Sequence, residues 1–554
     1  MSKLKFLALG GMGRVTQNLY LYQYQQEIIL IDCGIGFPDI YMPGVDALIP
    51  DITYLLNQVE AGAKIVGMIL SHGHDDHIGA LPYLLPNLPD FPIYASPLTA
   101  QFAHDRLLDK KVDRSIQVLS DRQNLALGQY FKFQFIAITH SIPDTKHILL
   151  ETPVGKIYHG SDFKLDKHPV DGRLSDMDFI EQIGRDDNLL MACLDCLRVE
   201  RDSWTPSEST VGPALLREMK DVEGKVLVTL MSSHLHRIQQ TIDACKQLGR
   251  KVVFVGRSVE QNIKSAAQSK SLNVPQGLLI DKKKMKQIPD NKLCIIIAGS
   301  QGQEGSSLVR AVYGDHQIVQ ISNHDKVIFS ADVIPGNEIP YYSAIDQLAA
   351  DEVDVVYPDI RPDIHRSGHA SRVEQELILK LLKPKFVMPI GGADRHRSLF
   401  KKIVAKPLSY QDWQILLPKT GEILEIDQQR VSVAQRISLS AKIIDGLGIG
   451  DVGPIVLSDR LNLSKAGIIV LILPRFKKKF DFNKMQVISR GFVFMKEADE
   501  VIKYIKKETI SIIQGLGKNV KDEELKHRLE KRLARRLFKI IRREPMILSV
   551  IWDS

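Results

Sequence analysis

The sequence contains very little cysteine, five residues in a chain of 554. So few cysteines cannot build the disulfide framework of a small secreted protein, and we therefore expect a cytoplasmic protein. Cys193 and Cys196 form a C-x-x-C motif, but they lie in the apolar run NLLMACLDCL. That run predicts a buried strand, which favours two structural cysteines over a redox or zinc-binding pair.

Long apolar runs are also absent. No stretch approaches the roughly 18 apolar residues of a membrane-spanning helix, and the opening MSKLKFLALGG is too short for a signal peptide. The hydrophobic fraction of 44% and the charged fraction of 25% are ordinary for a globular protein, and there is no long low-complexity tract. We therefore expect a globular protein with no membrane partner.

The chain is too long for a single hydrophobic core, so we expect several domains. Over the first 205 residues, strand-like runs alternate with turns, and polar residues follow their ends. Later runs such as KVLVTL and LCIIIAGS are regular, with helix-length segments between some of them, which predicts a separate, doubly wound parallel sheet. The pattern of strand-like runs and turns seen over the first 205 residues returns in KFVMPIGG. We therefore expect the second domain to be inserted in the first. The predicted parts are 1–205 and 365–430 for the first domain, 206–364 for the inserted domain, 431–447 for a linker and 448–554 for a small α/β domain.

Positive charge is concentrated at the end of the chain. The net charge is +7, and the excess of lysine and arginine lies after Ala441. The last predicted helix places apolar residues at helical spacing between basic ones, namely Leu529, Leu533, Leu537, Ile540 and Ile541. The basic surface indicates a polyanionic partner, most simply nucleic acid; a charged surface that meets only water is the alternative.

Histidine is scarce, with 16 residues in the whole chain, yet three of them crowd into SHGHDDHIG at residues 71–79. Imidazole nitrogens and carboxylates are the ligands that Zn²⁺ and similar ions take at about 2.0–2.2 Å. Four ligands on one tight turn cannot all converge on one tetrahedral ion. We therefore expect two ions, with His72 and His74 on one and Asp76 and His77 on the other.

Two further strand ends supply partners for this motif. FIAITHSIPDT presents His140, and KIYHGSDFK presents Asp162. His140 would complete a site of three histidines, and Asp162 could bridge both metals. Two ions about 3.5–4 Å apart generate hydroxide near neutral pH and hold the oxygens of a phosphoryl displacement. His159 lies on the same loop, but strand alternation predicts a hydrogen-bonding role for it.

The order H-x-H-x-D-H, strand-end His and strand-end Asp resembles the metallo-β-lactamase superfamily. ALGGMGRVTQNLYLY, DCGIGFPD and THSIPDT resemble the opening of the bacterial ribonuclease J family, and WTPSESTVG, GRSVEQN, FSADVIPGNE and IHRSGHAS resemble its β-CASP domain. DGLGIGDVGPIVLSDR and REPMILSVIWD resemble its C-terminal domain. The resemblance covers essentially the whole chain. It implies a metallo-β-lactamase αββα sandwich with an inserted doubly wound β-CASP domain and a small α/β C-terminal domain.

The resemblance also implies roles for particular residues. The implied metal ligands are His72, His74, Asp76, His77, His140 and Asp162. The implied catalytic residues are Asp76, Asp162, Asp195 and His369. The implied substrate-binding residues are Ser233, His234, His236, His365, Arg366, Ser367, Gly368 and His369. Asp46 and Asp445 match positions that resemble a structural calcium site.

The chain departs from the family pattern at one metal ligand. The family has a strand-end histidine that ligates the second metal, and the matching stretch VMPIGGADRHR has Gly391 there. His396 follows five positions later and could reach the site only if the loop folded back. Loss of one ligand among several weakens metal binding more readily than it abolishes the chemistry.

The leading hypothesis is a ribonuclease in which hydroxide held by two metals attacks RNA phosphodiesters. The expected ions are two zinc ions, with manganese or magnesium as alternatives and calcium at the structural site. The resemblance implies 5′-to-3′ exonuclease action favouring 5′-monophosphate ends, some endonuclease activity, roles in RNA maturation and decay, and a homodimer or homotetramer formed through the C-terminal domain.

Two rival hypotheses belong to other classes. One is a weakly active paralogue that acts as a partner subunit or RNA-binding scaffold, and it is favoured by Gly391. The other is hydrolysis of a small ester or thioester. The inserted domain and the basic tail argue against that reaction, because a small substrate needs neither.

Overall fold

The computed structural model describes residues 2–39, 41–186, 188–334, 336–446, 448–492, 498–516 and 520–553. The chain divides into two units, and each is described by itself. The first unit comprises residues 1–37 and 48–442, and the second comprises residues 38–47 and 443–554.

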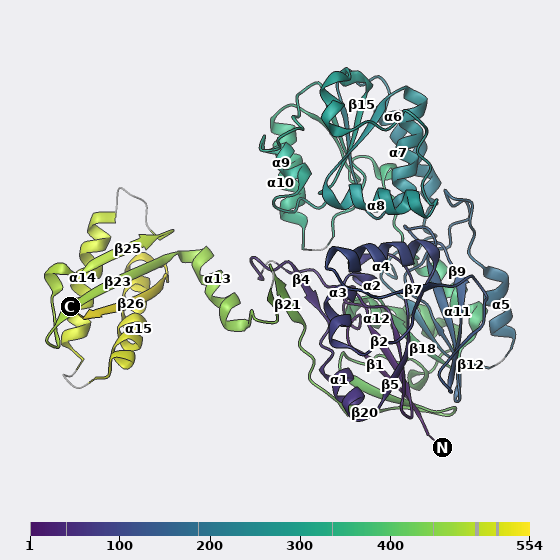
Figure 1. The fold of residues 1–554 in the computed structure, drawn as a ribbon, viewed down its shortest axis with the longest axis horizontal. Coiled ribbons are helices and arrows are strands. Elements are labelled where there is room, and N and C mark those ends of the chain that lie inside the picture. The colour runs from purple at the N-terminus through teal and green to yellow at the C-terminus, as the bar shows by residue number, and fades with distance from the viewer. Residues whose placement is uncertain are drawn as a thin grey trace. The chain divides into compact units, whose positions relative to one another are not determined.

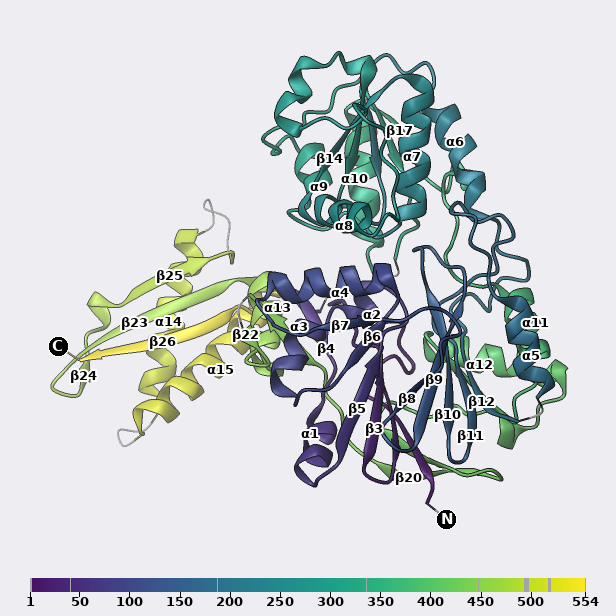
Figure 2. The same cartoon turned by 45° about the vertical axis from the view of Figure 1, so that its right-hand side comes forward.

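Two sheets face each other in the first unit (Figures 1 and 2). The eight-stranded sheet has the order β20 (Val431–Arg436), β19 (Glu422–Ile426), β1 (Leu4–Ala8), β2 (Tyr20–Tyr24), β3 (Glu27–Ile31), β5 (Lys64–Ile69), β6 (Ile93–Ala95), β7 (Ile116–Val118). The six-stranded sheet has the order β18 (Phe386–Ile390), β12 (Leu189–Asp195), β11 (Gly155–His159), β10 (Lys146–Thr152), β9 (Phe131–Ala137), β8 (Leu125–Leu127).

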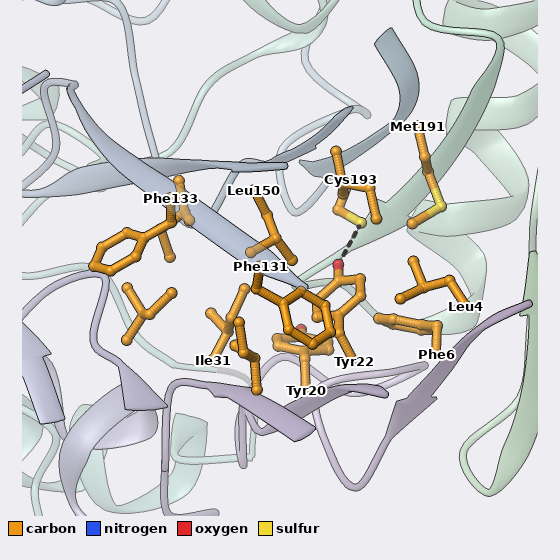
Figure 3. Packing of buried hydrophobic residues seen from close by; sticks show 14 of the residues in the cluster. Leu4, Phe6, Tyr20, Tyr22, Ile31, Phe131, Phe133, Leu150, Met191 and Cys193 are labelled. Carbon is orange, nitrogen blue, oxygen red and sulfur yellow. Dashed lines mark hydrogen bonds between the residues drawn. The ribbon is translucent and has the colours of Figure 1, made fainter. Parts of the chain in front are cut away.

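The main hydrophobic core lies between these sheets because strand side chains alternate between two faces. Phe131, Phe133 and Phe135 of β9 belong to this core, and Phe131 lies beside Tyr20 and Tyr22 of β2 (Figure 3). Ile136 lies on the opposite face, in a second core cluster. That cluster joins the sheet to the outer helices α5 (Met177–Arg185) and α11 (Arg372–Leu382).

Helices also cover the other sheet, among them α1 (Thr53–Glu60) and α4 (Pro97–Asp109) (Figure 2). The αββα sandwich implied by the resemblance is therefore confirmed. Cys193 and Cys196 are both buried and free, with Cys193 in the sheet core and Cys196 in the second cluster. The buried strand predicted for this run is therefore confirmed as β12, and the structural role of the two cysteines stays a prediction.

The inserted sheet is parallel throughout. Its order is β14 (Lys251–Val255), β15 (Leu293–Ile297), β13 (Val226–Thr229), β16 (Lys326–Phe329), β17 (Asp354–Val356). Helices lie on both of its faces (Figure 1), which confirms a doubly wound domain. They are α6 (Val211–Met219), α7 (Leu235–Leu248), α8 (Arg257–Gln268), α9 (Ser307–Val312) and α10 (Glu338–Ala350).

The linker expected over 431–447 is wrong in its first part. Residues 431–436 form β20, which pairs with β19 at the edge of the eight-stranded sheet. Five of the six residues of β20 are exposed. An exposed edge strand buries little apolar surface, so its sequence carries a weak strand signal.

The second unit packs helices against a small sheet. In that sheet β23 (Ile468–Phe476) pairs antiparallel with β25 (Gln486–Arg490) and parallel with β26 (Met546–Asp553). The helices are α13 (Pro454–Ala466), α14 (Ala498–Gln514) and α15 (Asp522–Ile541). Within the described parts of the chain, no helix is both long and apolar enough to cross a membrane.

Helix α15 is amphipathic, as its sequence predicts. Leu529, Leu533 and Leu537 are fully buried in the core of the second unit. Ile541 is partly buried against that core, whereas Ile540, in the last turn, is 62% exposed. The basic side chains between these residues lie on the remaining faces.

The substitution Leu533→Ala would leave a cavity beneath α15 and lower the free energy of unfolding of this unit by about 2–5 kcal/mol. Ile540→Ala on the same helix is the matched control, because truncation of an exposed side chain changes stability by only about 0.5 kcal/mol. Native-state hydrogen exchange of the α15 amides measures both. Equal exchange rates in the two variants would contradict the described packing.

Candidate metal centre

The candidate site lies where strands of both sheets end. Strands β11, β12 and β18 are parallel neighbours, so their carboxyl ends meet at one edge. Asp195 is the last residue of β12, Gly391 comes directly after β18, and Asp162 lies three residues after the end of β11. From the other sheet, β5 leads into His72 and His74 and then into the short helix α2 (Asp75–Ile78), which carries Asp76 and His77. His140 follows β9.

Three histidines and Asp162 form the first cluster, and their ligand atoms all lie within 4.8 Å of one another. His74 Nδ1 lies 3.1 Å from His72 Nε2 and 3.2 Å from His140 Nε2. Asp162 Oδ2 lies 3.8 Å from the Nε2 atoms of both His72 and His140. Ligand atoms about 2.1 Å from a tetrahedral ion are roughly 3.4 Å apart, so these separations suit one metal ion.

Asp76, His77 and Asp162 form the second cluster. His77 Nε2 lies 3.7 Å from Asp76 Oδ2 and 3.5 Å from Asp162 Oδ2. Asp162 therefore belongs to both clusters. The structure brings together all six residues that the sequence suggested as metal ligands.

Hydrogen bonds fix the tautomers of two of the histidines. His140 Nδ1 donates to the carbonyl oxygen of Gly368 at 2.7 Å, which leaves its Nε2 lone pair directed at the first cluster. His77 Nδ1 donates to Asp32 Oδ2 at 2.7 Å, which leaves its Nε2 for the second cluster. Such contacts behind a histidine are typical of metal sites, because they orient the ring and raise its basicity.

The electrostatics of the first cluster also suit a cation. Burial is the largest cause that lowers the pKa of all three histidines, well below the usual range for His72 and His140 and to about 3 for His74. These rings are therefore neutral near pH 7, and their lone pairs face one another in the interior. Buried acceptors in this arrangement need a cation or a donor between them.

In the second cluster the pKa values of Asp76 and His77 are raised, in contrast to the lowered values of the three histidines. Burial raises the pKa of Asp76 to about 6, although His77 opposes this shift. Burial would lower the pKa of His77, but Asp162, Asp76 and Asp32 together raise it well above the usual value. The raised pKa favours a second proton on His77, at Nε2, and a bound metal ion would take the place of that proton.

Sequence reasoning missed Asp32, which is fully buried behind His77. Besides His77, this carboxylate accepts hydrogen bonds from Ser71 N at 2.7 Å and Ser71 Oγ at 2.8 Å. It therefore ties the start of the histidine loop to α2. The only signal in the sequence is an acidic residue at the end of the apolar run EIILID, and many strands end in that way.

His147 was missed as well. Its Nε2 donates to the carbonyl oxygen of Ser161 at 3.1 Å, next to Asp162, and its Nδ1 accepts from the Tyr158 hydroxyl at 2.6 Å. His159 lies in the core, where its Nδ1 is 2.9 Å from the Tyr22 hydroxyl. The prediction that His159 is a hydrogen-bonding residue is therefore confirmed.

His369 and Asp195 form an ion pair beside the clusters. His369 Nδ1 lies 2.8 Å from Asp195 Oδ2, and its Nε2 lies 3.9 Å from Asp162 Oδ2. Burial alone would lower the pKa of His369, but Asp195 and Asp162 outweigh it and raise this pKa to about 9. The imidazole is then protonated at neutral pH and can donate a proton or a hydrogen bond.

The loop of residues 365–369 is held on several sides. The Ser367 hydroxyl accepts from His369 N at 3.1 Å. A side chain at Gly368 would collide with Ser141 and His140, since its Cβ would lie 2.7 Å from Ser141 Cβ. His365 and Arg366 lie at the start of the loop, and Arg366 donates to the Thr210 hydroxyl at 3.0 Å.

The other predicted substrate loop is less exposed than a binding role suggests. Ser233 is partly exposed, but His234 and His236 are buried. Neither ring nitrogen of His234 has a hydrogen-bond partner among the described residues, and His234 Nε2 lies 3.6 Å from Glu208 Oε2. Substrate binding by these three residues stays a prediction.

Gly391 faces the site without contributing a ligand. A Cβ atom there would lie 3.5 Å from Asp195 Oδ1 and 3.6 Å from Asp162 Oδ1, so the position points between these two carboxylates. His396 does not replace the missing side chain. Its Nδ1 accepts from Ala393 N at 3.2 Å, and its Nε2 lies 3.8 Å from Glu200 Oε1.

The suggested calcium ligands have protein partners in the second unit. Asp46 Oδ2 accepts from Gly446 N at 2.8 Å, and Asp445 forms an ion pair with Arg460. Arg460 thus supplies positive charge next to Asp445. Among the described residues the two aspartates do not belong to a cluster with metal-ligand spacing, and calcium binding stays a prediction.

The fold and the two clusters that share an aspartate define a protein of the metallo-β-lactamase superfamily, and residues 12–162 match that superfamily. Residues 223–348 match the "Ribonuclease J, beta-CASP domain", and residues 455–554 match the "Ribonuclease J C-terminal domain". The chain belongs to the ribonuclease J family.

Relatives cover the whole chain. It is 33% identical to Ribonuclease J of Thermus thermophilus over 100% of this chain and 95% of the relative. It is 31% identical to Ribonuclease J2 of Bacillus subtilis over 99% of this chain and 98% of the relative. A solved Enterococcus faecalis protein of unknown function shares the fold, with a TM-score of 0.52, 14% identity and coverage of 77% of this chain and 100% of that one.

Asp32→Asn keeps the size of the side chain but removes the charge that holds His77. We expect about 10–100-fold weaker zinc binding at the second cluster, the effect typical of such supporting residues. Competition with a chromophoric chelator measures the affinity. Asp51→Asn is the control, because Asp51 also accepts a backbone N–H, from Thr53 at 3.0 Å, but does so at the surface. Unchanged zinc affinity in Asp32→Asn would show that Asp32 does not support the site.

Proposed function

We propose that the chain is a metal-dependent ribonuclease that hydrolyses the phosphodiester bonds of RNA. One observation carries this proposal: two ligand clusters share Asp162 and lie beside the cationic His369. This arrangement suits a phosphoryl displacement, because two ions can stabilise negative charge on both the attacking and the leaving oxygen. Membership of the ribonuclease J family supports the same reaction.

We assign the first metal to His72, His74 and His140 and the second to Asp76 and His77, with Asp162 between them. Divalent ions held there would activate water and stabilise charge on phosphoryl oxygens. The mixed histidine and aspartate donors suit zinc, and manganese and magnesium are the alternatives. The second metal is held by fewer residues, since Gly391 offers no ligand.

His369 acts on the substrate in this proposal. Its ring is held by Asp195 through Nδ1, so the proton on Nε2 faces the clusters. A protonated imidazole there can donate to a phosphoryl oxygen or protonate the leaving oxygen. Asp195 keeps the ring oriented and charged, and the partly exposed side chain of Arg366 lies on the same loop for contact with RNA phosphates.

The direction of cleavage, the cellular role and the oligomeric state are inferred from the family and not from the geometry of the site. We infer 5′-to-3′ exonuclease action with some endonuclease activity, in RNA maturation and decay in the cytoplasm. We also infer a homodimer or homotetramer formed through the C-terminal domain. The exposed basic side chains of α15 would contribute to RNA binding.

The scaffold hypothesis has one observation in its favour, the glycine at position 391. The six candidate ligands and the His369–Asp195 pair are nevertheless all in place. Loss of one ligand out of the set predicts a weaker second site and not an inert protein.

A timed digest of 5′-monophosphorylated, end-labelled RNA with Zn²⁺ or Mn²⁺ tests the proposal. We expect shortening from the 5′ end by the wild type, and a loss of about 10³-fold or more when Asp76 and His77 are both replaced by alanine, since the second ion then loses its ligands. The control Asp105→Ala changes a residue of α4 outside the clusters and should cleave as the wild type does. Equal rates for the wild type and the double variant would favour the scaffold hypothesis.

A further inference from the structure

Arg237, on helix α7 of the inserted domain, is 1% exposed although it carries a full charge. A buried guanidinium is destabilising unless its donors are satisfied, so its partners show what it holds in place. The reaction proposed above makes no use of this residue. It also lies in no strand or helix that reaches the metal clusters.

The strongest contact of Arg237 is a bidentate ion pair with the buried Glu208. Arg237 Nε donates to Glu208 Oε1 at 2.9 Å, and Arg237 Nη2 donates to Oε2 at 2.7 Å. Parallel bonds of this kind fix both the distance and the plane of the pair. Glu208 belongs to the segment that leads from the first domain into the inserted domain, just before α6.

The remaining donors of Arg237 reach two other segments. Nη1 donates to the carbonyl oxygen of Ser330, after β16, at 2.8 Å. Nη1 also donates to His365 Nδ1 at 2.7 Å, and Nη2 donates to the carbonyl oxygen of Arg366 at 3.0 Å. His365 and Arg366 lie in the segment that leads back to the first domain. One side chain thus joins both connections between the domains.

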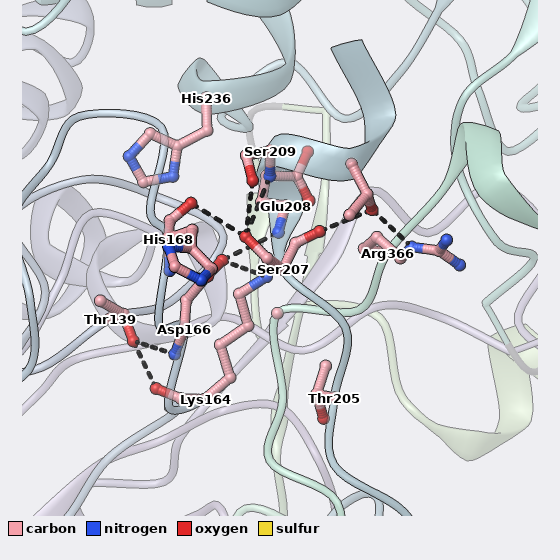
Figure 4. A network of polar contacts seen from close by, with 12 residues as sticks. Thr139, Lys164, Asp166, His168, Thr205, Ser207, Glu208, Ser209, His236 and Arg366 are labelled. Carbon is pink, nitrogen blue, oxygen red and sulfur yellow. Dashed lines mark hydrogen bonds and ion pairs between the residues drawn. The ribbon is translucent and has the colours of Figure 1, made fainter. Parts of the chain in front are cut away.

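Both ends of this network continue to the candidate metal centre. Glu208 N donates to Asp166 Oδ2 at 2.8 Å, and Asp166 forms an ion pair with Lys164 at 3.2 Å (Figure 4). Asp166 follows the shared ligand Asp162 by four positions on the same loop. At the other end, Arg366 precedes Gly368, whose carbonyl oxygen holds His140.

We propose that Arg237 is a positioning residue: its contacts with Glu208, His365 and Arg366 hold the 365–369 loop so that His369 faces the metal clusters. This proposal rests on the proposed function for its kinetic consequence only. Lysine cannot replace arginine in this role, because its single ammonium group cannot make two parallel bonds to a carboxylate and also reach two carbonyl oxygens.

A merely stabilising role is the alternative, and the chain provides a matched control for it. Arg250 lies in the same domain, is 3% exposed and donates to the carbonyl oxygens of Gly224, Leu293 and Val222. Those partners lie at the amino ends of the strands, whereas the 365–369 loop lies beyond their carboxyl ends. Arg250→Lys therefore disturbs a similar buried network without touching the loop.

The first measurement is hydrogen exchange of residues 364–371 in the full-length chain, which needs no activity. We expect faster exchange there in Arg237→Lys and unchanged exchange in Arg250→Lys. Unchanged exchange in Arg237→Lys would overturn the proposal, whatever the protein does to RNA. If Arg237→Lys does not fold, Glu208→Gln takes its place with the same expectation, since it keeps the size of the side chain and weakens the ion pair.

The second measurement is a double-mutant cycle on RNA cleavage. Arg237→Lys should lower kcat by about 10²-fold with little change in KM and unchanged metal content, because the 365–369 loop is displaced from the reacting atoms. In a His369→Ala background the same substitution should lower kcat by less than about threefold, because the residue through which it acts is gone. A full additional loss in that background would show that Arg237 does not act through His369, and it would overturn the proposal. An inactive wild type would refute the proposed function. The hydrogen-exchange measurement would still test whether Arg237 holds the 365–369 loop.

Discussion

The carboxylate of Asp162 is the point on which the candidate site depends. Its Oδ2 lies 3.8 Å from the Nε2 atoms of His72 and His140, 3.5 Å from that of His77 and 3.9 Å from that of His369. Burial would raise the pKa of Asp162, but His77 and His369 hold it well below its usual range. Histidine side chains from both sheets and from the loop that leads back from the inserted domain thus converge on one negative charge.

The sandwich explains why these residues can meet. Apolar side chains on the facing sides of the two sheets pack into one core. This packing brings the ends of their strands close together at one edge. The buried contacts behind the ligands, Asp32 on His77 and the Gly368 carbonyl oxygen on His140, then orient the imidazole rings. The fold therefore supplies rigidity, and the loops supply the chemistry.

Much of this site could be predicted from the sequence because its ligands form a local pattern. H-x-H-x-D-H places four candidate ligands within six residues, and His140 and Asp162 follow recognisable strands. Asp32 and Arg237 carry no such pattern, because their roles depend on partners 29 to 129 positions away. A lone aspartate at a strand end or an arginine in a helix becomes informative only when the fold shows what it contacts.

Other differences between the sequence-based expectations and the structure arise from contacts with residues that are distant in the sequence. The predicted linker contains β20 because an exposed edge strand lacks an apolar pattern. Asp445 already has a cationic partner in Arg460, which the spacing of the two residues could not reveal. At Gly391 the sequence showed only that a family ligand is missing. The structure adds that the position faces Asp162 and Asp195 and that His396 has other partners.

The proposed sharing of Asp162 between two metal ions is most directly tested by calorimetric titration of zinc into the metal-free wild type and the Asp162→Asn variant. The account predicts that the wild type binds two ions per chain, the second more weakly, and that Asp162→Asn weakens both. Binding of two ions by Asp162→Asn as tightly as by the wild type would contradict it.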